Sequence, residues 1–134
     1  MKLSKAERES VRLKYDGLCA YCGELLPERW HADHLEPVVR DWYKSGAPAS
    51  RPENDHLANM MPACPPCNID KHSIRLEDWR GMIERSNDVL LRDNGTFRRA
   101  VRYGLVISKV RPVVFYFEFV NNLTLKATPK EPTK

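Results

Sequence analysis

Four cysteines constrain the fold of this chain more than any other feature of its sequence. They form two Cys-x2-Cys pairs, CAYC at 19–22 and CPPC at 64–67, separated by 41 residues. Two such pairs supply four thiolates, which is the ligand set of a tetrahedral structural zinc site. Sulfur would fill all four coordination positions, so this ion would not bind water or substrate. The expected zinc ligands are Cys19, Cys22, Cys64 and Cys67.

A redox dithiol is the alternative reading of a Cys-x-x-Cys pair. A thioredoxin-like site requires a βαβ context, and neither pair has one. The segment 17–23 favours a metal knuckle, because Gly17 and Gly23 bracket the first pair and allow the positive φ angles of tight turns.

Length and apolar patterning restrict the class of protein. The chain has 134 residues, enough for one domain with one modest core, and contains no apolar run near 18 residues. We expect a single domain over 1–124, with a core at about 15–73, an extension over 74–124 and a disordered tail over 125–134. The charged N-terminus lacks an apolar signal core, so we expect a cytoplasmic protein without a membrane partner.

Positive charge is concentrated in the second half of the chain. Residues 73–134 carry 12 Lys and Arg against 7 Asp and Glu, and the stretch 97–117 contains no acidic residue. A basic patch of this kind suits nucleic acid, although an ordinary solvated helix face would look similar. The candidate DNA contacts in this half are Arg98, Arg99 and Arg102.

Local patterns predict an α+β order of elements. Ser4 and Glu7 form a capping-box pattern, which predicts an N-terminal helix to about Tyr15. The remaining expected elements are a strand over 30–39, a surface loop over 40–54, a strand over 56–61, and helices over 68–73, 76–91 and 96–103. The alternation of apolar residues over 113–120 predicts a final strand, which would serve as core or as a dimer surface.

The segment WHADHLEP at 30–37 places polar groups inside a strand-like run. Asp33 and His34 would lie beside the start of the helix after the second cysteine pair, because zinc joins the two pairs. There Asn68 and His72 stand at i and i+4, on one helix face. Asp33, Asn68 and His72 could offer oxygen and nitrogen ligands to Mg²⁺ or Mn²⁺, with other divalent ions possible. His34 could take a proton from water near neutral pH.

CAYC, ADHLEPV and NMMPACPPCNIDKH together resemble the HNH endonucleases, the zinc-knuckle type of ββα-metal nuclease, over about residues 15–73. The resemblance implies a small zinc-stabilised core, a catalytic divalent ion and DNA as substrate. It implies that His34 is the general base and that Asp33 and Asn68 are metal ligands. It also implies that Asn59 braces the loop and the base, and that Lys71 is a basic residue near the phosphate.

Several of these residues also have plain structural readings. His72 resembles a second helical ligand of the bacteriocin nucleases, but a phosphate contact or no role at all is equally open. Asn68 could simply cap its helix, and Lys71 could be a solvated lysine. His31 and His56 stay outside the candidate set, because a lone histidine on or beside a strand is more often a satisfied or exposed side chain.

Three functional classes are compatible with the sequence. The leading hypothesis is a metal-dependent DNA endonuclease acting through water activated by His34. A zinc-stabilised nucleic-acid-binding module without catalysis would use the same cysteines and arginines. An interaction protein would use the strand over 113–120 to form a homodimer or to join a larger phage or restriction complex.

Overall fold

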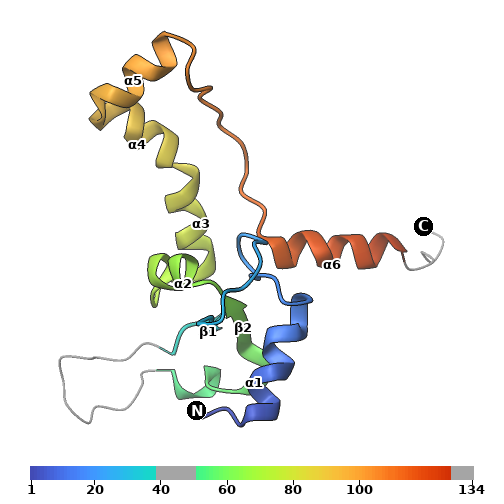
Figure 1. Cartoon of the computed structure of the whole chain (residues 1–134). Helices are drawn as coiled ribbons and strands as arrows, with labels where there is room; N and C mark the ends of the chain where they lie inside the picture. The colour runs from blue at the N-terminus through green and yellow to red at the C-terminus, as the bar shows by residue number, and fades with distance from the viewer. Residues whose placement is uncertain (39–50, 128–134) are drawn as a thin grey trace, which may run out of the picture. The chain divides into compact units, whose positions relative to one another are not determined.

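The computed structural model describes residues 1–38 and 51–127, with side chains described to residue 123. Most of the loop expected over 40–54 therefore lies outside the described residues. The chain divides into two compact units, one formed by Met1–Arg75 with Val114–Lys134 and the other by Leu76–Val113. The mixed helix and strand content confirms the expected α+β class (Figure 1).

The first helix, α1, spans Lys5–Arg12 and begins where its sequence predicts. The Ser4 side chain accepts a hydrogen bond from the backbone of Glu7, and the Glu7 carboxylate accepts one from the backbone of Ser4. This reciprocal cap satisfies two of the N–H groups that a helix start leaves without partners. Val11 is the buried residue of α1.

Two short antiparallel strands form the sheet within the described residues. Strand β1 spans His31–His34 and β2 spans Met60–Ala63, with His31 opposite Ala63 and His34 opposite Met60. The returning strand begins later than predicted, because Leu57–Asn59 forms a 3₁₀ turn. Side chains alternate along β1. Those of His31 and Asp33 point to one face of the sheet, and those of Ala32 and His34 point to the other.

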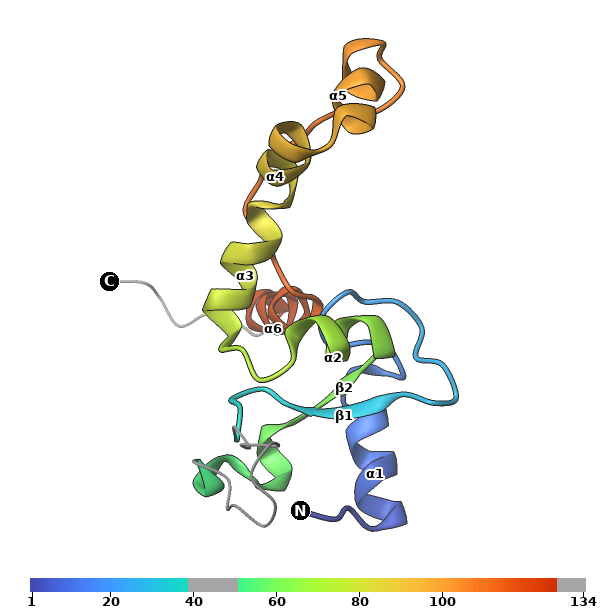
Figure 2. The same cartoon turned by 90° about the vertical axis from the view of Figure 1, so that its left-hand side faces the viewer.

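Helices α1 and α2 lie on opposite sides of the sheet (Figures 1 and 2). Helix α2 spans Pro65–Lys71 and begins directly after Cys64, earlier than expected, because proline is well suited to the first helical position. On the α1 side, Val11, Trp30 and Met60 form a small buried cluster. This arrangement places the second cysteine pair at the junction of strand and helix.

The C-terminal strand prediction is wrong, because Tyr116–Ala127 forms helix α6. The N–H groups of Tyr116 and Phe117 donate to the carbonyls of Tyr21 and Ala20, so the start of α6 docks on the first cysteine pair. The rings of Phe115 and Phe117 are buried and meet the Tyr21 ring edge-on. The alternating apolar residues Phe115 and Phe117 are therefore buried by contacts with Tyr21, not by pairing with another strand.

Helix α6 extends into the segment 125–134 that the sequence predicts to be a tail. Residues 125–127 belong to α6, and residues 128–134 lie outside the described part of the chain. No helix among the described residues has the length and apolar character needed to span a bilayer.

The second unit consists of three helices. Helix α3 spans Leu76–Glu84, α4 spans Ser86–Asp93, and α5 spans Gly95–Arg102. The single helix expected over 76–91 is therefore broken at Arg85. The Ser86 hydroxyl donates to the carbonyl of Met82 four residues earlier, a contact that bends helices.

Candidate functional site

The four cysteines converge as predicted. Their Sγ atoms all lie within 4.8 Å of one another, and those of Cys22 and Cys64 are 3.7 Å apart. Four sulfurs at about 2.3 Å from a zinc ion would be separated by about 3.8 Å, so the observed spacing fits tetrahedral zinc. None of the four forms a disulfide. The donor set and geometry fit a structural metal rather than a dithiol couple.

The electrostatics of the cluster also favour a cation. A hydrogen bond with Cys67 lowers the pKa of Cys19 to about 4, whereas burial raises the pKa of Cys22 to about 11. The same contact with Cys19 raises the pKa of Cys67. Four thiols this close cannot all ionise without a compensating charge, and a bound metal ion supplies that charge.

Gly23 is required by the backbone of the first cysteine pair. Its φ is +78°, and a Cβ added there would lie 2.9 Å from the ring of Tyr116. Its N–H donates to the carbonyl of Cys19 and closes the turn. The glycine therefore allows both the turn and the close approach of α6.

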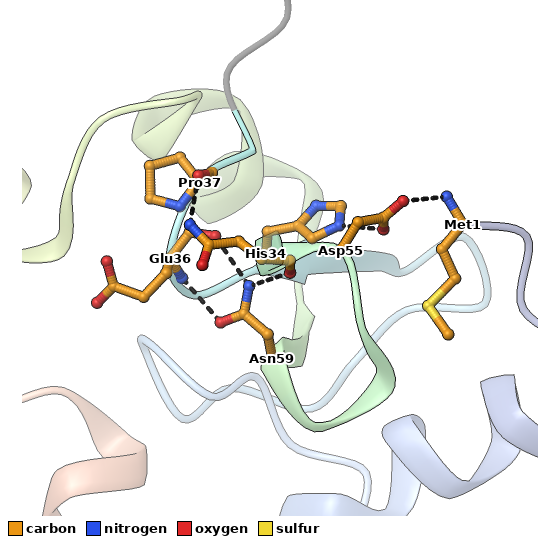
Figure 3. Close-up of polar contacts among 7 residues, drawn as sticks. Met1, His34, Glu36, Pro37, Asp55 and Asn59 are labelled. Atoms are coloured by element: carbon orange, nitrogen blue, oxygen red, sulfur yellow. Dashed lines mark hydrogen bonds and ion pairs between the residues drawn. The ribbon is translucent and has the colours of Figure 1, made fainter. Parts of the chain in front are cut away.

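His34 forms a pair with Asp55, a residue that sequence reasoning missed. The Nε2 atom of His34 lies 2.9 Å from Oδ1 of Asp55, whose other oxygen lies 2.6 Å from the amino group of Met1 (Figure 3). The ammonium group of Met1, and then His34, lower the pKa of Asp55 to about 2. The only sequence signal was an aspartate just before the expected returning strand.

This contact determines which nitrogen of His34 can act as a base. The Asp55 carboxylate is ionised near neutral pH and can only accept a hydrogen bond. Nε2 of His34 must therefore carry the proton of that bond, which leaves the lone pair on Nδ1. An aspartate that fixes the tautomer of a histidine in this way prepares the ring to accept a proton.

Asn59 is buried and joins three backbone segments. Its Oδ1 accepts from the N–H of Glu36, and its Nδ2 donates to the carbonyls of Glu36 and Asn54 (Figure 3). Its own carbonyl accepts from the N–H of Leu35. Asn59 thus holds the backbone immediately after His34 in place.

Asp33 is buried and directed toward Lys71 and Tyr21. Its Oδ2 lies 3.1 Å from the ammonium of Lys71 and accepts a hydrogen bond from the Tyr21 hydroxyl. Burial, and then the charge of Asp33, raise the pKa of Tyr21, so the hydroxyl remains a donor. The predicted metal ligand therefore has two protein partners already.

Lys71, which the sequence predicts as a DNA contact, is buried in the structure. Its side chain is 0% exposed, and its ammonium donates to the carbonyl of His34 at 2.8 Å. An ammonium enclosed in this way cannot reach a phosphate on a bound duplex. The residue acts instead within the fold, as a brace between α2 and β1.

Asn68 and His72 do not share a helix face, contrary to the sequence prediction. Helix α2 ends at Lys71, and His72 is an exposed residue with φ of +50°, outside helical geometry. Asn68 instead meets His31, with 2.7 Å between the amide Nδ2 and the imidazole Nδ1. Sequence reasoning set His31 aside, although alternation along the strand could have indicated it.

A cavity of about 500 Å³ lies at the outer edge of β1. The polar side chains His31, His34 and Asn68 line it, together with the cationic residues Lys2 and Arg8. Within the described residues β1 pairs only with β2, so side chains from both faces of β1 reach this edge. The cavity therefore combines a candidate base, amide and imidazole donors, and positive charge.

The predicted arginine cluster belongs to the second unit. Arg98, Arg99 and Arg102 are exposed on α5. Arg98 also donates to the carbonyls of Leu91 and Arg92 at the end of α4. Exposed guanidinium groups on one short helix remain suited to phosphate contacts.

The comparisons with known proteins agree with the resemblance. The family model described as HNH endonuclease matches residues 19–73, from the first cysteine to the residue after His72. Neither the curated proteins nor the solved structures give a match. The matched segment contains both cysteine pairs, the sheet and α2.

Proposed function

Residues 19–73 belong to the HNH endonuclease family, and on this premise we propose that the protein is a metal-dependent DNA endonuclease. The family supports a nuclease or nucleic-acid function in general. The observation that carries the finer proposal is the contact of His34 with Asp55 at the wall of a cationic cavity.

In this proposal His34 is the general base. Its Nδ1 takes a proton from a water molecule, and the resulting hydroxide attacks the phosphorus of the scissile phosphodiester. The bond between phosphorus and the 3′ oxygen breaks, and the leaving 3′ oxygen takes up a proton from solvent. Asp55 holds the ring in the required tautomer and stabilises the imidazolium that forms. Asn59 fixes the backbone after His34, so the ring keeps its place in the cavity. The expected products are a 5′-phosphate and a 3′-hydroxyl.

A divalent cation, Mg²⁺ or Mn²⁺, would act as a Lewis acid on the phosphate oxygens. Asn68 lines the cavity beside His34 and can supply an amide oxygen to such an ion. The zinc on the four cysteines has no open position and would serve folding alone.

DNA binding would use two sources of positive charge. Lys2 and Arg8 line the cavity, and Arg98, Arg99 and Arg102 lie on the separate second unit. A non-catalytic DNA-binding module would retain the arginines but would not need a histidine and aspartate pair in a cavity. The two functions therefore differ at His34.

Nicking of supercoiled plasmid with Mg²⁺ or Mn²⁺ tests the proposal. His34→Ala should lower the rate by about 10²–10⁴-fold, the usual contribution of a general base, while DNA affinity is retained. His56→Ala is the matched control, because His56 is exposed and is not among the residues lining this cavity. Equal nicking by the wild type and His34→Ala would remove His34 from its role. DNA binding without nicking by the wild type would favour the binding module.

A further inference from the structure

The turn after α5 exposes three large apolar side chains. Tyr103, Leu105 and Ile107 are 72%, 81% and 80% exposed, and the last two values are the highest among the large apolar residues that the structure describes. Single exposed apolar residues are ordinary, but three at alternate positions of one short segment form a patch. The patch belongs to the second unit, in which neither α4 nor α5 has a buried residue. A surface of this kind indicates a binding partner.

The backbone holds Leu105 in a fixed position. The N–H of Gly104, a residue with φ of +73°, donates to the carbonyl of Val101 at 3.0 Å. The N–H of Leu105 donates to the carbonyl of Ala100 at 2.8 Å. Together these bonds form a Schellman turn, in which an apolar residue at the Leu105 position usually packs back on the helix. Here that side chain projects into solvent, so the turn presents a pre-organised apolar group.

Positive charge adjoins this turn. Arg98, Arg99 and Arg102 are exposed on α5, and no acidic residue occurs between 97 and 117. The Arg102 guanidinium lies 5.4 Å from the centre of the Tyr103 ring, which places it at the patch. Arg99 and Arg102 form no ion pair within the part of the chain that the structure describes. Their charges are therefore available to phosphates.

This charge distinguishes among the partners that would cover an apolar patch. A second copy of the chain would set the arginines of the same turn against each other, which opposes self-association. Duplex DNA complements the charge and is the substrate of the proposed function. Proteins that bind the minor groove combine arginines with an apolar wedge, often leucine or isoleucine, that enters between base pairs and kinks the duplex by about 20–90°.

We propose that the turn after α5 binds duplex DNA in the minor groove, with Leu105 inserted between base pairs as a wedge. Arg99 and Arg102 contact the phosphates beside it, and Ile107 lies in the groove next to the wedge. This inference rests on the proposed function for DNA as the ligand. Because the wedge must unstack two base pairs, binding should favour easily kinked pyrimidine–purine steps over stiff A-tracts.

Closure of a short linear duplex into a circle by DNA ligase measures the kink. A duplex of about 120 base pairs is shorter than the persistence length of about 150 base pairs and closes slowly unless a protein bends it. Zinc-loaded His34→Ala protein, which should bind DNA without cutting it, should raise the rate of closure by about tenfold or more. Adding Leu105→Ser should abolish the rise, whereas adding Leu25→Ser should retain it. Leu25 is the matched control, because it is 78% exposed and belongs to the other unit.

The salt dependence of DNA binding tests the arginines separately. Arg99→Ala/Arg102→Ala should reduce the slope of log affinity against log salt concentration by about two, because two phosphate contacts are lost. Leu105→Ser should leave this slope unchanged, because an apolar wedge releases no counterions. An unchanged slope in the arginine variant would overturn the assigned phosphate contacts.

Equal ring closure by the Leu105→Ser and Leu25→Ser proteins would overturn the wedge, as would DNA binding that leaves closure at its rate without protein. Both substitutions replace exposed side chains, so neither should change thermal unfolding. A protein that sediments as a dimer, and as a monomer after Leu105→Ser, would identify a second copy as the occupant and would also overturn the proposal. Plasmid nicking by a protein that does not bend DNA would refute this inference alone. Ring closure that depends on Leu105, in a protein whose wild type does not nick, would refute the proposed function alone.

Discussion

Replacing Lys71 by methionine tests the buried ion pair between Lys71 and Asp33. The lysine is 0% exposed, and its ammonium meets Asp33 at 3.1 Å and the carbonyl of His34 at 2.8 Å. Methionine fills a similar volume but offers neither contact. It would leave the Asp33 carboxylate buried with only the Tyr21 hydroxyl in place of two partners.

Removing one member of a buried ion pair destabilises a protein by about 3–5 kcal/mol. The free energy of unfolding of a small domain is about 5–15 kcal/mol, so this loss is a large fraction of the total. Each 1.4 kcal/mol changes an equilibrium constant about tenfold. The unfolded fraction of Lys71→Met should therefore rise by about two to three and a half powers of ten.

Urea unfolding followed by tryptophan fluorescence, with zinc in excess, measures this change through the midpoint and slope. The control is Lys5→Met, an exposed lysine of α1, which should change stability by less than about 0.5 kcal/mol. Asp33→Asn/Lys71→Met should recover much of the loss, because both charges are removed together. Lys71→Met with the stability of Lys5→Met would refute the buried ion pair.

Three further predictions concern the metal cluster and Asp55, the partner of His34. Removing the metal with a chelator should unfold the region around the cysteine pairs and make all four thiols reactive to a thiol reagent. Thiols that stay protected after chelation would exclude the zinc cluster. Asp55→Asn should lower nicking by about 10²-fold, because the His34 tautomer is released. The pKa of Asp55 is lowered to about 2, so its stabilisation is present above its ordinary pKa and is lost as the pH falls toward 2. Acid unfolding curves of the variant and the wild type should therefore converge below that pH.

The features that the sequence predicted correctly depend on local chemistry or on the fixed spacing of residues. The Ser4 and Glu7 cap involves residues three apart, and its hydrogen bonds form wherever the helix begins. The cysteine pairs specify one another, because only a shared ion satisfies four thiols in this arrangement. The cysteine pairs, together with the segments ADHLEPV and NMMPACPPCNIDKH, indicated the core and the resemblance to the HNH endonucleases before any tertiary contact was known.

The features that differ from the sequence prediction depend on contacts between residues far apart in the chain. Lys71 contacts His34 across 37 positions, and His34 contacts Asp55 across 21. Neither burial nor pairing of these side chains follows from their own neighbours in the chain. The segment after Phe115 shows an alternation typical of a strand, yet backbone bonds to the first cysteine pair start a helix there.

The sequence alone determined that two cysteine pairs enclose an Asp-His segment and an asparagine, because the types and spacing of these residues carry that information. Only the tertiary structure decided which polar side chains face the cavity. Packing of α2 on β1 buries Asp33 with Lys71 and leaves His31 with Asn68 at the open edge. The physical reason is that desolvation depends on everything that surrounds a group, and much of what surrounds these four side chains comes from distant parts of the chain.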